Sequence, residues 1–170
     1  ADVDEECDED PNKTEPGICG CGVSDVDTDG DGTSDCDDTT PDGDVTLSFV
    51  NPTEGSVELH FDSNMAVHGF GVKIGGVTLT GAEGGFSTTS FLGDTGVVIG
   101  VDLMGSALMG DDGDAALSGL LATLTFDPHW EGYTITGTDT EVGGALATEL
   151  GVTGPDSITI PPCQDTDGDT

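Results

Sequence analysis

VTLSFV at residues 45–50 and VELHF at residues 57–61 decide the fold of this chain. In both segments apolar side chains alternate with polar ones, which is the period of a strand with one buried face. Further short segments are rich in Val, Thr, Ile and Phe, and Gly, Asp, Asn or Pro separates them. They are residues 70–74, 77–80, 86–91, 97–103, 120–126, 133–136 and 157–160. The pattern predicts an all-β, two-sheet β-sandwich over residues 45–160.

Helical periodicity is nearly absent from the same region. We expect at most a single helical turn at residues 115–122 and another at residues 145–150.

Residues 1–44 have a different character, with almost no apolar side chains and about half of the acidic residues of the chain. A segment this short builds no core of its own and needs disulfides or bound metal to hold a shape. Most of the cysteines lie here, among Asp and Gly: Cys7, Cys19, Cys21 and Cys36. Their setting indicates disulfides in an oxidising compartment rather than zinc, because the C-x-C spacing has no matching second pair. Cys163 is then left over.

The charge balance of the whole chain is extreme. Acidic residues number 35, the only basic residues are Lys13 and Lys73, and the formal net charge is −33. Such a surface repels nucleic acid and anionic membranes and favours divalent cations. There is no apolar run of about 18 residues, so we expect no membrane insertion. Because the chain begins at Ala1, we expect a mature or excised piece of an extracellular or cell-surface protein.

Residues 27–38 follow the calcium-loop spacing D-x-D-x-D-G-x-x-D-x-x-D. Calcium takes about six to eight oxygen ligands, which such a loop presents from fixed positions. The side-chain ligands predicted here are Asp27, Asp29, Asp31, Asp35 and Asp38, with the backbone carbonyl of Thr33 at position 7. Asp25 extends the alternation toward a second, adjacent ion. Neither flank is an amphipathic helix, so we expect the ion to stiffen the segment rather than to operate a switch.

DPNKTEPGICGCG at residues 10–22, together with this loop, resembles the thrombospondin type 3-like calcium repeats of secreted bacterial proteins. The resemblance covers residues 1–41 and implies an irregular segment wrapped around Ca²⁺ and pinned by disulfides. Thr40 stands where the family usually has Cys before Pro41, so the disulfide pairing of the family does not transfer unchanged.

FGVKIGGVTLTGAEGG at residues 70–85, VIGV at residues 98–101 and LATLTF at residues 121–126 are similar to cohesin-like domains. Those domains are jelly-roll sandwiches of extracellular scaffolds that bind partner modules or carbohydrate. The resemblance covers about residues 45–160 and implies a jelly-roll-like arrangement of the sandwich.

Residues 161–170 return to the style of the N-terminus and begin a calcium loop that stops at its fifth position. If the N-terminus of a following unit is read after Thr170, it continues that loop. The ligands predicted for this split site are Asp165, Asp167, Asp169, Asp2, Asp4, Glu5 and Glu6. Either the chain is one unit of a tandem array, or separate copies complete each other's site head to tail; a frayed tail is the remaining interpretation. A head-to-tail contact that does not close on itself generates a filament.

Motifs for catalysis are missing around His60, His68 and His129, so we predict that the protein is not an enzyme. The main hypothesis is an extracellular calcium-binding structural module of a head-to-tail filament, stalk or matrix. The alternative is a cohesin-like adhesion module that binds carbohydrate or another surface protein, with residues 1–44 as a rigid spacer. Trp130 with Tyr133 is a candidate sugar-stacking pair, although such pairs more often belong to the core or rim of a sandwich.

Overall fold

The structure is a computed structural model that describes residues 7, 13–27, 34, 36–37, 43–102, 104–109, 115–144 and 149–163. The chain divides into two compact units, Ala1–Asp42 and Gly43–Thr170.

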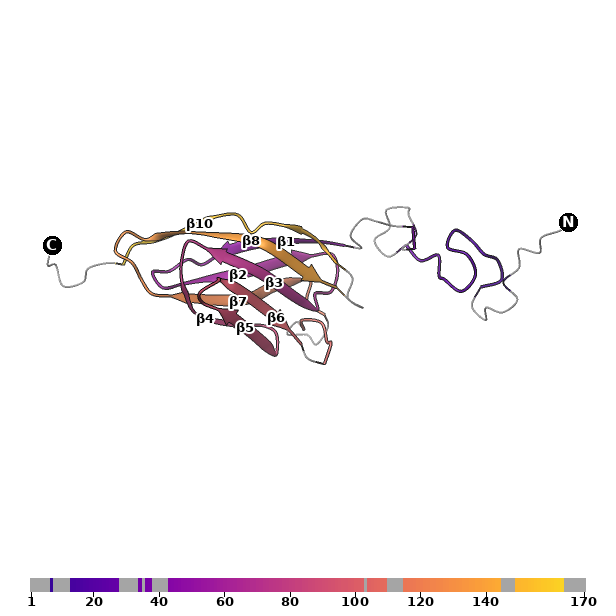
Figure 1. The fold of residues 1–170 in the computed structure, drawn as a ribbon, viewed down its shortest axis with the longest axis horizontal. Coiled ribbons are helices and arrows are strands. Elements are labelled where there is room, and N and C mark those ends of the chain that lie inside the picture. Colours follow the sequence, from indigo (N-terminus) through magenta and orange to yellow (C-terminus); the bar gives the residue numbers. More distant parts are fainter. Residues whose placement is uncertain are drawn as a thin grey trace. The chain divides into compact units, whose positions relative to one another are not determined.

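The larger unit is a sandwich of two five-stranded sheets (Figure 1). The first sheet has the order β4-β7-β2-β1-β9, formed by Leu79–Gly84, Ser118–Phe126, Ser56–Ser63, Asp44–Val50 and Gly151–Thr153. The second has the order β10-β8-β3-β6-β5, formed by Ile158–Ile160, Tyr133–Gly143, Gly69–Gly75, Val97–Val101 and Thr88–Leu92. Throughout the described part of the chain the regular structure is strand, which confirms the predicted all-β two-sheet class.

β1 and β2 form the hairpin that the opening segments predict. They pair antiparallel, with Leu47 opposite Phe61 and Phe49 opposite Leu59. The connection is closed by the backbone N–H of Thr53, which donates to the carbonyl of Ser56 at 2.8 Å. Because side chains on a strand alternate between faces, this register places the apolar residues of both strands on the inner side of the sheet.

The core lies between the two sheets and takes side chains from both. Its largest fully buried members are aliphatic: Leu59, Leu121, Leu124, Ile135, Leu150 and Ile160. Full burial of one such side chain contributes about 1.5–3 kcal/mol. Phe70 and Phe86 add an aromatic contact within the core, with ring centroids 6.0 Å apart.

Some local predictions differ from the structure. The expected helical turn at 115–122 is wrong, because Ala115 bridges to Met109 and β7 begins at Ser118. The strand expected at 77–80 runs from Leu79 to Gly84. β9, which pairs parallel to β1, was not predicted, since a strand of three residues carries too little periodicity. The turn expected at 145–150 falls mostly on residues 145–148, which lie outside the described residues.

Two disulfides hold the N-terminal unit, as the cysteine composition predicts. They join Cys7 to Cys21 and Cys19 to Cys36, and Cys163 has no disulfide partner. Lys13 adds a polar centre to this unit, because its Nζ donates to the carbonyls of Gly20 and Val23 at 2.8 Å each.

Candidate functional site

The two outer faces of the sandwich differ in chemistry. The outer face of the sheet that contains β1 and β2 carries polar side chains, namely Thr46, Ser48, Glu58, His60, Asp62, Thr123 and Thr125. Glu58 accepts hydrogen bonds there from Asn51 at 2.7 Å and from His60 at 2.9 Å. These contacts, that of Asn51 first, lower the pKa of the Glu58 carboxyl. This face is an ordinary solvated sheet surface.

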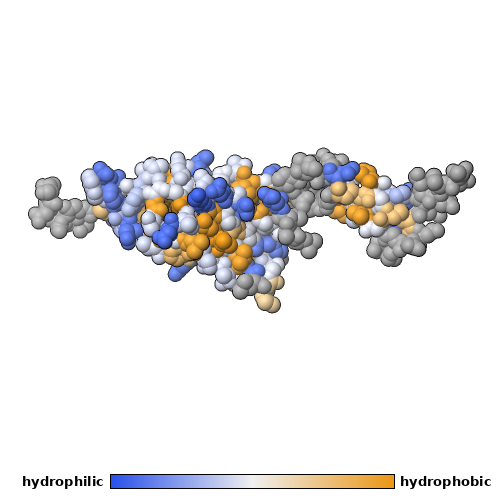
Figure 2. All heavy atoms as spheres, in the orientation of Figure 1, coloured by the Kyte–Doolittle hydropathy of each residue, from blue (hydrophilic) through white to orange (hydrophobic). Residues whose placement is uncertain are grey.

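The outer face of the other sheet carries a row of aliphatic side chains, Leu92, Val97, Ile99 and Val101, which we call the aliphatic face. Leu92 is 61% exposed and Ile99 is 46% exposed, while the two valines are half-buried. The register joins them into one patch, because Leu92 lies opposite Val97 and the other two follow along β6. Figure 2 shows apolar surface exposed along the sandwich between hydrophilic areas. Large contiguous exposed apolar patches mark interaction sites, which makes the aliphatic face a candidate.

Glycines on β3 leave the flank of this row uncovered. Gly71 pairs with Ile99 and Gly69 pairs with Val101. A Cβ added at Gly71 would meet no atom within 4 Å, so nothing in the described fold requires glycine there for space. A glycine inside a strand often marks the place where another backbone comes close. The side of Ile99 is therefore open to a partner.

Lys73 lies at the edge of the aliphatic face, opposite Val97. It is the only basic residue in residues 43–170. Its Nζ is 3.7 Å from Oδ2 of Asp139, and both side chains are more than half exposed. Exposed pairs of this kind contribute about 0–1 kcal/mol, so the ammonium is free to change partner at little cost.

Sequence reasoning did not single out the aliphatic face. The available indication was VVIGV at residues 97–101, an apolar run without alternation. Such a run indicates that both faces of a strand are apolar. Which of the two faces stays exposed depends on the elements that pack against the strand.

The predicted calcium ligands fall mainly outside the described residues. Asp25 and Asp27 are described; the others, Asp29, Asp31, Thr33, Asp35, Asp38, Asp165, Asp167, Asp169, Asp2, Asp4, Glu5 and Glu6, are not. Oδ1 of Asp25 accepts from Lys13 Nζ at 2.7 Å and from the backbone N–H of Cys19 at 2.8 Å. The Lys13 hydrogen bond, followed by that of Cys19, lowers the pKa of the Asp25 carboxyl. Oδ1 of Asp25 is thus engaged by Lys13 and Cys19 of the same unit, and both the loop at residues 27–38 and the split site at the two termini remain predictions.

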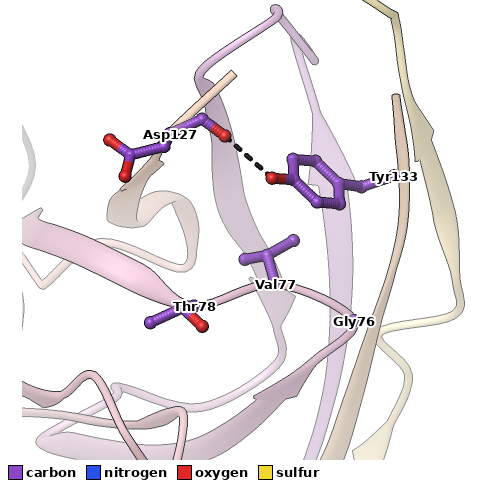
Figure 3. Close-up of a pocket in the computed structure, with 5 residues that line it drawn as sticks. All are labelled: Gly76, Val77, Thr78, Asp127 and Tyr133. Atoms are coloured by element: carbon purple, nitrogen blue, oxygen red, sulfur yellow. Dashed lines mark hydrogen bonds between the residues drawn. The ribbon is translucent and has the colours of Figure 1, made fainter. Parts of the chain in front are cut away.

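A second candidate surface lies at the end of the sandwich where β7 leads into β8. Trp130 is 70% exposed, so it does not belong to the core. Tyr133 packs edge-on against Phe126 at 5.8 Å and donates from its hydroxyl to the carbonyl of Asp127 at 3.1 Å. Figure 3 shows this hydrogen bond above Val77, beside an open hollow of about 540 Å³ that Gly76, Val77, Thr78, Asp127 and Tyr133 line.

Within the described residues, no group of three or more His, Cys, Asp or Glu side chains is placed to hold a metal ion. The same residues contain no helix that is long and apolar enough to cross a membrane.

Comparison with known proteins rests on structure. No family model and no curated protein matches this sequence. A chain of the Coh-OlpC-Doc435 complex, a type I cohesin–dockerin complex from Clostridium thermocellum, has a TM-score of 0.51 at 12% identity, covering 74% of this chain and 99% of that one. The seventh ScaB type I cohesin from Pseudobacteroides cellulosolvens has a TM-score of 0.52 at 15% identity, covering 75% and 98%.

A non-cellulosomal cohesin from the archaeon Archaeoglobus fulgidus is also similar, with a TM-score of 0.50 at 10% identity, covering 69% of this chain and 91% of that one. The predicted cohesin-like sandwich is therefore confirmed at the level of the fold: the β-sandwich of this chain has the fold of cohesin domains.

Proposed function

We propose that this chain is a non-enzymatic extracellular adhesion module that binds another protein through the aliphatic face. The observation that carries the proposal is the contrast between the two sheets: among the described residues one outer face exposes the aliphatic row, and the other outer face is mainly polar. Burial of that row against a partner removes apolar surface from water, which is the main favourable term in protein association. The two disulfides support an oxidising, extracellular location.

The partner class that the fold supports is a dockerin-type module, because a similarly folded chain comes from a cohesin–dockerin complex. The aliphatic side chains of the face are suited to a protein partner whose binding surface has an apolar centre. Lys73 beside that centre offers a cation to a carboxylate or carbonyl of the partner, while the charge of −33 on the whole chain favours a partner with basic groups at its rim.

The test is titration calorimetry with each dockerin-type module encoded in the source genome. Ile99→Asp and Leu92→Asp introduce a charge into the aliphatic face, and we expect each to weaken binding by about tenfold or more. Ser48→Asp is the matched control, because Ser48 is exposed on the outer face of the opposite sheet, opposite His60. The proposal is refuted if no such module binds, or if both aspartate variants bind as the parent does.

We also propose that the N-terminal unit binds Ca²⁺ through the loop at residues 27–38. Two features of the described residues support it. The Cys19–Cys36 disulfide ties Cys36, which lies within the loop, to the segment before it, with Cα atoms 5.8 Å apart. Asp25, two residues before the first predicted ligand, is held by an ion pair with Lys13. The carboxylate oxygens of the loop are the hard donors that Ca²⁺ prefers.

Calorimetric titration of Ca²⁺ into chelator-treated protein tests this site. Asp31→Asn removes one predicted charged ligand, whereas Asp62→Asn removes one exposed carboxylate from β2 of the sandwich and serves as the control. We expect only Asp31→Asn to weaken binding, and equal affinities of the two variants contradict the site.

End-to-end assembly through the split site is the further step of this proposal. Sedimentation velocity with Ca²⁺ and with chelator measures it. Larger species that dissociate in chelator support calcium-dependent assembly, and an unchanged monomer under both conditions refutes it.

A further inference from the structure

Trp130 is an exposed aromatic side chain on a firmly held turn. The turn spans residues 129–132, and the backbone N–H of Gly132 donates to the carbonyl of His129 at 3.0 Å. The same carbonyl accepts from the backbone N–H of Cys163 at 3.1 Å, which ties the turn to the segment after β10. An indole that is 70% exposed leaves much apolar surface in water, so its presentation on a fixed turn calls for an explanation.

The conformation of the turn is specified locally. Gly132 has φ +72°, and a Cβ there would overlap the carbonyl oxygen of Ile160. The backbone N–H of Glu131 donates to Nδ1 of His129 at 3.2 Å, which fixes the imidazole against the turn. The three aromatic rings are neighbours, and we call them the ladder. The ring centroid of His129 lies 5.3 Å from that of Tyr133 and 5.7 Å from that of Trp130. The indole is therefore positioned before any ligand arrives.

Two open hollows include residues next to the rings of the ladder in the sequence; the lining of the first is mainly polar and that of the second is mainly apolar. The hollow in Figure 3 is lined by Asp127 and Thr78 as well as Tyr133, and the Asp127 carboxylate points away from the Tyr133 ring. A second open hollow, of about 640 Å³, has Thr53 and Glu54 together with three prolines among its lining residues. Asp127 and Pro128, which precede the turn, line one hollow each. Both volumes lie in the usual range of ligand sites, about 300–1,000 Å³.

From this arrangement we infer that the Trp130 end of the sandwich is a binding site for a neutral oligosaccharide. A sugar ring has one face of C–H groups, which packs on an aromatic ring, and a rim of hydroxyls, which bond to carboxylates and hydroxyls. An exposed indole that contacts Tyr133 through the His129 ring, with Tyr133 lining the polar hollow, matches that amphipathic shape. A protein partner is better matched by the contiguous aliphatic face. The charge of −33 excludes glycans rich in uronate or sulfate by repulsion.

The test uses the full chain with cellohexaose, xylohexaose and mannohexaose as neutral probes and oligogalacturonate as the anionic one. Trp130 is the only tryptophan, so its fluorescence reports ligands that stack on it. We expect saturable quenching by at least one neutral probe and none by oligogalacturonate. In calorimetry, Trp130→Ala should weaken that binding by about tenfold or more. Met104→Ala, which truncates a side chain that is 90% exposed elsewhere, should not.

The inference is overturned if no neutral probe binds at millimolar concentration, or if Trp130→Ala binds as tightly as the parent. It is overturned equally if Trp130→Ala weakens dockerin binding and no glycan binds, which would assign the indole to a protein interface. Ile99→Asp separates the two proposals, because it should weaken protein binding by about tenfold or more and leave glycan affinity unchanged.

Discussion

Gly71 and Gly100 lie on neighbouring strands of one sheet but on its opposite faces, so the same substitution should have opposite effects at the two positions. Gly71 faces outward beside Ile99, and a Cβ there meets no atom within 4 Å. Gly100 is buried opposite Phe70, and a Cβ there would overlap the Phe70 ring. Neither glycine has a φ in the left-handed region, so alanine is compatible with both backbones.

Gly71→Ala should raise the free energy of unfolding by about 0.5–1 kcal/mol, because alanine loses less backbone freedom on folding than glycine does. Gly100→Ala gains the same stabilisation from reduced backbone freedom. It also forces the Phe70 ring against the rest of the core, and such overpacking costs about 1–3 kcal/mol. The expected net result for Gly100→Ala is a loss of about 1–2 kcal/mol.

Thermal unfolding followed by circular dichroism measures both variants, with shifts in Tm of about 2–8 °C per kcal/mol. A loss of stability in Gly71→Ala equal to that in Gly100→Ala would refute the assignment of the two faces. Because Gly71→Ala is expected to fold well, it also tests the partner surface: a methyl group beside Ile99 should weaken binding of a dockerin-type module while stability rises.

The remaining predictions concern pH, disulfides and calcium. The pKa of Glu58 is lowered in the folded protein, chiefly by the hydrogen bond from Asn51. The ionised carboxylate therefore stabilises the fold above the unfolded pKa of about 4.3, and this stabilisation is lost as pH falls through the folded pKa. Glu58→Gln should reduce the loss of stability in acid, measured by urea unfolding from pH 6 to pH 3, and a pH dependence equal to that of the parent contradicts this expectation. Paired Cys19→Ser and Cys36→Ser should leave the Tm of the sandwich unchanged, because its core comes from residues 45–160, but should speed proteolysis of the N-terminal unit. Ca²⁺ should protect that unit from protease and leave the sandwich transition in place; equal cleavage in Ca²⁺ and in chelator contradicts this expectation.

β1 and β2 could be predicted from their alternating apolar and polar residues, because each strand has one buried and one solvated face. Val45, Leu47, Leu59 and Phe61 are all buried, as the period-two pattern requires. β9 could not be predicted from the sequence, because it pairs parallel to β1 across about a hundred residues, and such a pairing produces no local sequence pattern. The turn expected at 115–122 failed for a related reason, since pairing of β7 with both β2 and β4 overrides the helix propensity of its alanines and leucines.

The candidate sites show the same division. The cysteine-rich N-terminal segment and its disulfides could be predicted from composition, because a coreless segment needs covalent or metal cross-links. The predicted calcium ligands stay predictions. Neither the aliphatic face nor the exposure of Trp130 could be predicted, because both depend on which neighbours cover a side chain.

By itself, the sequence determined the class of the fold, the acidic character and the segment that holds the disulfides, since periodicity, charge and cysteine placement are local properties of the chain, whereas the pairing of the cysteines came from the structure. Only the tertiary structure decided which apolar residues remain exposed. Val98 is fully buried while the adjacent Ile99 is 46% exposed, although the two differ by one methylene. The physical reason is that a strand with two apolar faces buries whichever face the opposite sheet covers, and the partner-binding surface proposed here is the face that remains uncovered.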